Sequence, residues 1–157
     1  MIEKSIVSKN IYVSDEDFDI GKIYKGVKQI SDKLGYALIE KEQVNKPGKY
    51  GNEIKFSFIL DREIDYFVEA VFEINFYFDN INKVKERDHG DCKVIISGKL
   101  IYDYKNRWGM RKFDRFLLGL YLKVTEPTLK KTYIIPFMIK DGNTIHDSIK
   151  NNFGFYS

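Results

Sequence analysis

A cluster of possible metal ligands, Asp88-His89-Gly90-Asp91-Cys92, places four side chains of that kind within five residues. A structural zinc site normally needs two separated pairs of ligands. The chain has one cysteine and two histidines, so it has no second Cys/His pair. We therefore expect no metal at Asp88, His89 and Asp91. We predict instead a polar hairpin loop in which Gly90 has a positive φ.

Other catalytic arrangements are missing from the sequence. Cys92 begins an alternating apolar face, where a buried and unreactive thiol is the usual finding. Glu69 and Glu73 lie on one strand face about 13–14 Å apart, too far for a glycosidase pair. Neither a Gly-x-Ser-x-Gly elbow nor a glycine-rich phosphate loop occurs. We therefore expect a protein that is not an enzyme and that uses no cofactor.

The segment from Tyr102 to Arg115 is the strongest functional candidate, because it holds three of the five arginines and the only tryptophan. Arginine recognises phosphate and carboxylate groups, and a tryptophan can stack on a base or a lipid group. The segment therefore predicts binding to an anionic partner, either RNA or an acidic protein. The candidate contact residues are Lys105, Arg107, Trp108, Arg111, Lys112 and Arg115.

A purely structural role for the same residues is the alternative. Residues 53–79 carry a net charge of −5, so the three arginines can pair with strand acids such as Glu69 and Glu73. Trp108 would then pack into the edge of the core.

A second function of a different class is a carrier for a small apolar ligand. The ligand would lie between a sheet and a C-terminal helix. Its lining would include Phe72, Phe76 and Leu120. An enclosed apolar cavity of a few hundred Å³ would favour this function over an interaction domain.

Alternating apolar residues predict the strands that must position these side chains. A first strand is expected within Ile2–Val13, a second at Tyr36–Val44, and further strands at 52–60, 65–79 and 92–104. The even-numbered residues of 66–78 should face the helices. Because residues 65–79 would span roughly 50 Å if straight, the sheet must curve.

Helical periodicity occurs at both ends of the chain. Ser14 and the acids after it predict the start of a helix that ends at Gly35. A second helix follows from Phe113 to Val124, with its apolar stripe at Phe113, Phe116, Leu117, Leu120, Tyr121 and Val124. Pro127 predicts a break and restart, Pro136 an interruption, and Asn143 the cap of a short final helix.

The resulting order is β-α-β-β-β-β-α-α, which predicts an α+β fold. It comprises a curved antiparallel sheet of about five strands, with an N-terminal helix and C-terminal helices on one face. The outline resembles the helix-grip, START-like arrangement, although a strand and a short helix of that pattern are missing. The residues Gly98 to Tyr104, Trp108 and Phe116 to Lys123 also resemble a group of small archaeal α+β proteins, a likeness that implies no reaction.

Length and composition indicate one domain over residues 1–157. The 26 basic and 23 acidic residues give a net charge of only +3, so the local charge of a segment is more informative than the total. About half of the residues are types with AT-rich codons, so the many aromatic residues do not by themselves indicate base stacking. A single cysteine, an N-terminus without a signal-peptide pattern and no apolar run of about 18 residues lead us to expect a cytoplasmic protein.

Overall fold

The sheet has five antiparallel strands in the order β1-β5-β4-β3-β2, which confirms the predicted α+β fold. The computed structural model describes residues 1–84 and 87–154. The strands are β1 (Ile2–Phe18), β2 (Ala37–Pro47), β3 (Asn52–Glu63), β4 (Val68–Val84) and β5 (Arg87–Tyr102). The helices are α1 (Ile20–Leu34), α2 (Lys112–Val124), α3 (Glu126–Leu129), the π-helix η1 (Lys130–Ile139) and α4 (Lys140–Asn152).

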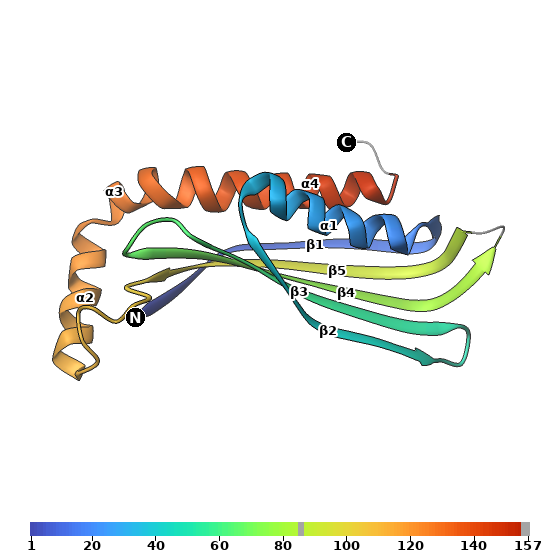
Figure 1. Ribbon diagram of the computed structural model, residues 1–157, viewed down its shortest axis with the longest axis horizontal. Helices are drawn as coiled ribbons and strands as arrows, with labels where there is room; N and C mark the ends of the chain where they lie inside the picture. Colours follow the sequence, from blue (N-terminus) through green and yellow to red (C-terminus); the bar gives the residue numbers. More distant parts are fainter. Residues whose placement is uncertain (85–86, 155–157) are drawn as a thin grey trace.

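The helices differ in how they meet the sheet. In Figure 1, α1 and the continuous run of α3, η1 and α4 lie over one face of the curved sheet. By contrast, α2 extends beyond one end of the sheet. No helix among the described residues is both long enough and apolar enough to cross a membrane.

The core lies between the sheet and these covering helices. The predicted inward face of β4 is confirmed from Val68 to Phe78, where every even-numbered residue is at most 1% exposed. Tyr66 was predicted to belong to this face, but it is 68% exposed because β4 begins only at Val68. The neighbouring strand β5 buries Cys92, Val94, Ile96, Leu100 and Tyr102 against the same core.

The first helix starts later than Ser14, which corrects the predicted cap. Residues 14–17 continue β1 instead, because Glu16 and Asp17 pair with β5 and residues 14 and 15 form a bulge between paired residues. Asp19 is the actual N-cap, and its carboxylate accepts a hydrogen bond from the Lys22 N–H at 3.1 Å. The predicted end is confirmed, since Gly35 has φ +82° and terminates the helix in the left-handed conformation.

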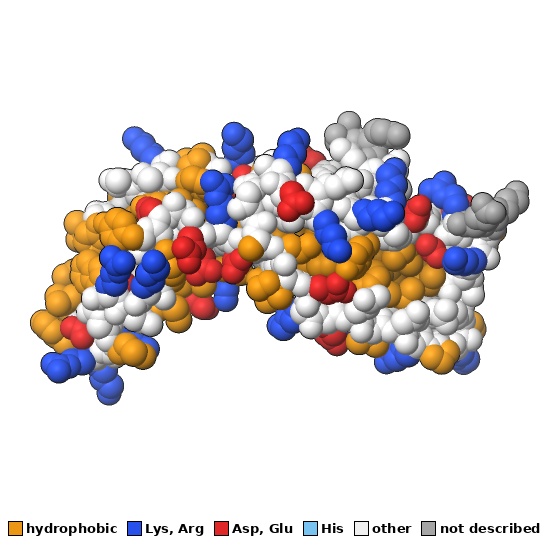
Figure 2. Space-filling view, viewed as in Figure 1, with side chains coloured by type: hydrophobic (Ala, Val, Ile, Leu, Met, Phe, Trp, Pro, Cys, Tyr) orange, Lys and Arg blue, Asp and Glu red, His pale blue; other side chains and the backbone are white. Residues whose placement is uncertain are grey.

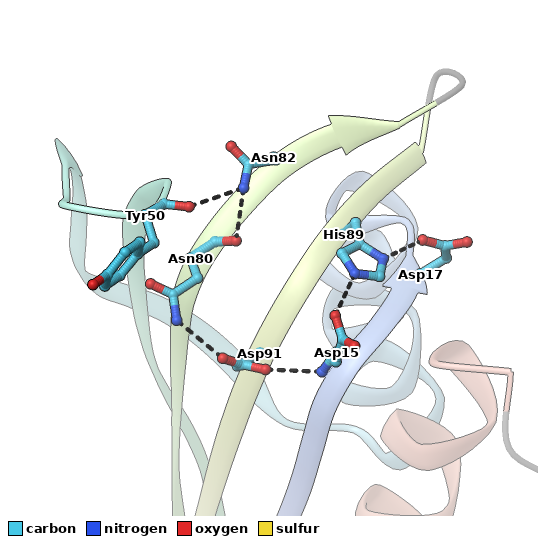
Figure 3. A network of polar contacts seen from close by, with 7 residues as sticks. All are labelled: Asp15, Asp17, Tyr50, Asn80, Asn82, His89 and Asp91. Atoms are coloured by element: carbon cyan, nitrogen blue, oxygen red, sulfur yellow. Dashed lines mark hydrogen bonds and ion pairs between the residues drawn. The ribbon is translucent and has the colours of Figure 1, made fainter.

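Two bulges curve the sheet at the end where β4 meets β5, and β1 and β4 continue past them beyond their predicted limits. Asp15 and Asn80 have positive φ angles of 53° and 56° where β1 and β4 slip in register against β5. The Asp91 carboxylate on β5 accepts hydrogen bonds from the Asp15 backbone N–H and from the Asn80 side chain, at 2.8 and 3.1 Å (Figure 3).

The predicted hairpin loop at residues 88–91 is therefore wrong, because this segment lies inside β5. Gly90 does not have a positive φ. The reason for a glycine here is close approach, since a Cβ would lie 2.8 Å from the carbonyl oxygens of Asp79 and Asn80.

The C-terminal helices form one rod rather than separate short helices. The restart at Pro127 is confirmed, because α3 carries this proline in its first turn. Pro136 does not interrupt the rod, since it lies inside the wider π-helix η1. Asn143 lies within α4 and caps nothing, whereas the predicted apolar residues Ile145 and Ile149 are buried.

Candidate functional site

The predicted apolar stripe of α2 is turned outward, although its spacing is typical of a stripe that faces the core. Leu118 and Leu122 are 1% exposed and anchor the helix to the rest of the protein. The predicted stripe is exposed instead, with Phe113 at 67%, Phe116 at 64% and Leu120 at 49%. The periodicity correctly grouped the residues that share a face, but it did not determine which face is covered.

The geometry of the helix shows how wide this outward face is. At about 100° per residue, Phe113, Phe116, Leu117, Leu120, Tyr121 and Val124 lie within an arc of roughly 140°. The helix extends past the end of the sheet, where the described elements leave its outer side open (Figure 1). A large apolar surface is therefore presented to solvent by a rigid element.

A buried carboxylate shapes the loop before α2. Asp103 is 2% exposed and accepts hydrogen bonds from the backbone N–H groups of Arg107 and Trp108, at 2.8 and 3.1 Å. Asp103 itself has a φ of +54°, which aspartate tolerates better than most residues. This turn holds the backbone at 107 and 108 in place, so the position of both side chains is defined.

Trp108 lies at the border of the exposed face. The residue is 38% exposed, and its ring packs on Tyr121 at a centroid distance of 5.1 Å. Tyr121 in turn meets the edge of Phe67, and the Arg107 guanidinium lies 5.8 Å from the Tyr66 ring. Trp108 is thus supported by one neighbour and still reaches solvent.

The predicted cationic residues are all brought to this end of the molecule. Lys105, Arg107, Arg111, Lys112 and Arg115 are exposed, as is Lys123. Among the described residues, none of the six forms an ion pair with a carboxylate within 4 Å. The expected pairing with the strand acids is not seen.

The two strand acids have other surroundings. Glu73 pairs with Lys41 at 3.9 Å. Glu69 is partly buried beside Asp61 and Glu63, and this burial and the neighbouring charges raise its pKa.

We call the exposed side chains of residues 105–124 the basic apolar surface. The segment holds six cationic residues and the acid Asp114, a net charge of +5. Figure 2 shows hydrophobic and basic side chains close together over the α2 end of the molecule. The sequence identified Trp108 and every one of these cations except Lys123, but it missed the exposed apolar residues because their spacing is also that of a core helix.

The residues expected to line an apolar carrier are not brought together. Phe72 and Phe76 are fully buried, and the Phe72 ring meets Tyr36 edge-on at 5.6 Å. Leu120 instead faces solvent on α2.

The side chains of His89 on β5 and of Asp15 and Asp17 on β1 form a polar cluster that joins the two strands, which we call the clamp. Both ring nitrogens of His89 lie 2.6 Å from carboxylate oxygens, Nδ1 from Asp17 and Nε2 from Asp15 (Figure 3). The hydrogen bonds to Asp17 and Asp15 raise the pKa of His89. Among residues 1–84 and 87–154, no group of three or more His, Cys, Asp and Glu side chains is arranged to hold a metal ion.

Comparison with known proteins adds no functional assignment. No family model matches the sequence, and no curated protein is detectably similar to it.

Proposed function

We propose that the protein is a non-enzymatic binding domain that contacts an anionic partner through the basic apolar surface. The observation that carries this proposal is the set of six exposed cations without carboxylate partners among the described residues, next to exposed aromatic rings. Arginines that have no carboxylate partner in the described part of the chain can bind phosphate or carboxylate groups in a bidentate manner.

The rigidity of the surface supports the same function. Asp103 fixes the loop and Leu118 and Leu122 anchor the helix, so little order has to be imposed when a partner binds. The arrangement of Trp108 against Tyr121 supplies an aromatic contact beside the charges.

A titration with simple polyanions tests this proposal. Labelled single-stranded RNA and polyglutamate are titrated at two salt concentrations against the wild type and an Arg107/Arg111/Arg115→Ala variant. We expect wild-type binding that weakens with salt, because bound counterions are released, and a smaller salt slope for the variant. Equal, weak and salt-insensitive signals from both proteins would contradict the proposal.

A further inference from the structure

The apolar part of the basic apolar surface indicates which kind of anionic partner it fits. We propose that the partner is the surface of a lipid bilayer with acidic headgroups, and this inference rests on the proposed function. Many of the exposed side chains are aliphatic, including Met110 at 69%, Val124 at 73% and Leu120 at 49% exposed. These aliphatic side chains offer no ring on which a nucleic-acid base could stack, whereas the acyl boundary of a bilayer accepts them together with the exposed rings of Phe113 and Phe116.

The shape of α2 suits contact in the plane of a membrane. The helix is 13 residues long, about 20 Å, and its apolar arc of roughly 140° lies on one side along its whole length. A helix that lies in the interface buries such a face at the boundary between headgroups and acyl chains. Because α2 extends beyond the sheet in Figure 1, a flat surface can approach it without meeting the rest of the protein.

Apart from Arg115, which by helical geometry lies on the side of α2 opposite the apolar arc, the charged side chains stand where lipid headgroups would lie. By helical geometry, Lys112 and Lys123 border one edge of the apolar arc. Arg107 and Arg111 lie at the end of the helix nearest the loop. The one acid of the segment, Asp114, borders the opposite edge and accepts a hydrogen bond from the Arg111 N–H at 3.3 Å. The net charge of +5 is complementary to a bilayer that contains phosphatidylserine.

The aromatic side chains lie at the border between these two parts. Trp108 and Tyr121 pack on one another beside the apolar arc and remain partly exposed. Tryptophan and tyrosine are enriched at membrane–water interfaces, because each ring combines an apolar body with a polar group.

A second copy of the chain fits the surface less well. It would present the same net charge of +5, so a contact between two α2 helices would bring like charges together. An isologous dimer through this face is therefore disfavoured by the very residues that favour an acidic bilayer.

Vesicle flotation combined with tryptophan fluorescence tests the proposal. The vesicles are phosphatidylcholine alone or phosphatidylcholine with about one third phosphatidylserine. Trp108 is the only tryptophan, so its emission reports directly on this surface. We expect flotation and a blue shift with acidic vesicles, and both should weaken as salt is raised.

Two variants separate the apolar and the charged contributions. An Arg107/Lys112/Lys123→Ala variant should bind acidic vesicles ~100-fold more weakly, at about a tenfold loss for every one to two charges removed. A Phe113/Phe116/Leu120→Ser variant should lose both flotation and the blue shift. These side chains are exposed, so neither variant should unfold the protein, which circular dichroism and the single Phe116→Ser variant check.

Matched controls remove similar side chains elsewhere. Lys22/Lys25/Lys33→Ala removes three exposed charges from α1, and Tyr12/Ile39/Tyr50→Ser removes three exposed apolar side chains from the sheet and its loops. Both should float as the wild type does, to within about fivefold, because screening limits the reach of distant charges to ~8 Å.

The outcomes distinguish this inference from the proposed function. Binding to RNA or polyglutamate without binding to acidic vesicles would overturn the membrane inference and leave the proposed function standing. Failure to bind any of the three would overturn both. Flotation that the serine variant retains, or sedimentation that shows a dimer which the serine variant abolishes, would also overturn the membrane inference.

Discussion

Asp103 controls the loop that carries Arg107 and Trp108. Its buried carboxylate holds two backbone N–H groups, and its own backbone is left-handed. An exposed cation on an ordered loop keeps a defined position, whereas the same cation on a loose loop must be ordered when a partner binds. One internal side chain therefore preorganises an external surface.

Replacing Asp103 should disturb this surface from within. Asp103→Ala leaves two N–H groups without their acceptor and places alanine at φ +54°, so we expect a loss of about 1–3 kcal/mol in unfolding free energy. Trp108 emission should also change. Asp103→Asn keeps an acceptor and tolerates this φ, so its effect should be smaller. Urea unfolding and fluorescence check both variants, and equal stability of all three proteins would contradict this role.

His89 provides a residue whose charge depends on pH. Hydrogen bonds to Asp17 and Asp15 raise its pKa above the ordinary value of 6.5. A raised pKa means that the folded state binds the proton more tightly than the unfolded chain does. The contribution of the clamp to stability is therefore fully present below pH 6.5 and is lost as the pH rises through the folded-state pKa.

An NMR titration of the His89 ring tests this assignment. We expect a midpoint above 6.5 in the wild type and a lower midpoint in Asp17→Asn. The hydrogen bond to Asp17 is the largest cause of the raised pKa, and an asparagine at this position carries no negative charge. A wild-type midpoint at or below 6.5 would show that the clamp does not favour the charged ring.

Helix α2 presents the basic apolar surface because of its position beyond the sheet, and its helix propensity is not at its maximum. Its single buried side, with Leu118 and Leu122, leaves most of the helix dependent on its own backbone for stability. Gly119 lies in the middle of the helix, and a Cβ built there meets no atom within 4 Å. The helix therefore contains one position where an extra methyl group adds propensity without a clash.

Gly119→Ala should stabilise the protein by roughly 0.5–1 kcal/mol, because alanine loses less backbone entropy in a helix than glycine does. Gly142→Ala is the matched control in α4. Its Cβ would lie 3.1 Å from a methyl group of Val7, so the same gain is not expected. Urea unfolding measures both variants. A destabilised Gly119→Ala protein would mean that this side of α2 is covered.

At the scale of the whole molecule, one buried hydrogen bond joins the segment between α1 and β2 to the C-terminal rod. The Tyr36 hydroxyl, just before β2, donates to the Asp141 carboxylate of α4 at 2.7 Å, and both residues are buried. Burial raises the pKa of Asp141, while the hydrogen bond from Tyr36 and the nearby Arg62 charge act to lower it. The bond thus makes a buried carboxylate tolerable where the C-terminal rod crosses the sheet.

Tyr36→Phe should cost about 1–3 kcal/mol near neutral pH, because it leaves the buried carboxylate without its donor. Removing the donor also raises the pKa of Asp141 further, and a raised carboxyl pKa favours the fold only at low pH. The loss should therefore shrink as the pH falls towards about 4.

Asp141→Asn is the control for this prediction, since an amide cannot carry the buried charge. Urea unfolding of both variants across this pH range measures the effect. A cost of Tyr36→Phe that is independent of pH would contradict the role of the carboxylate charge.

The sequence by itself determined the order of elements and most of the core. Strict alternation in β4 and β5 can bury only one face, so Phe72, Ile74 and Phe76 had to point inward. Gly35 was identifiable as a helix end because few other residues adopt its φ of +82°. The cations of residues 105–115 were identifiable because arginine is scarce elsewhere in the chain.

Only the tertiary structure decided where those elements meet solvent. Phe113 and Phe116 have the spacing of core residues, yet they are exposed because α2 extends past the sheet that could have covered them. Likewise, Gly90 lies in a strand because the neighbouring Asp91 carboxylate binds donors in two bulges. These donors belong to Asn80 and Asp15, which precede Asp91 by 11 and 76 positions in the sequence. Periodicity is a local property of the chain, whereas burial and bulge pairing depend on contacts between distant segments, and these form only in the folded protein.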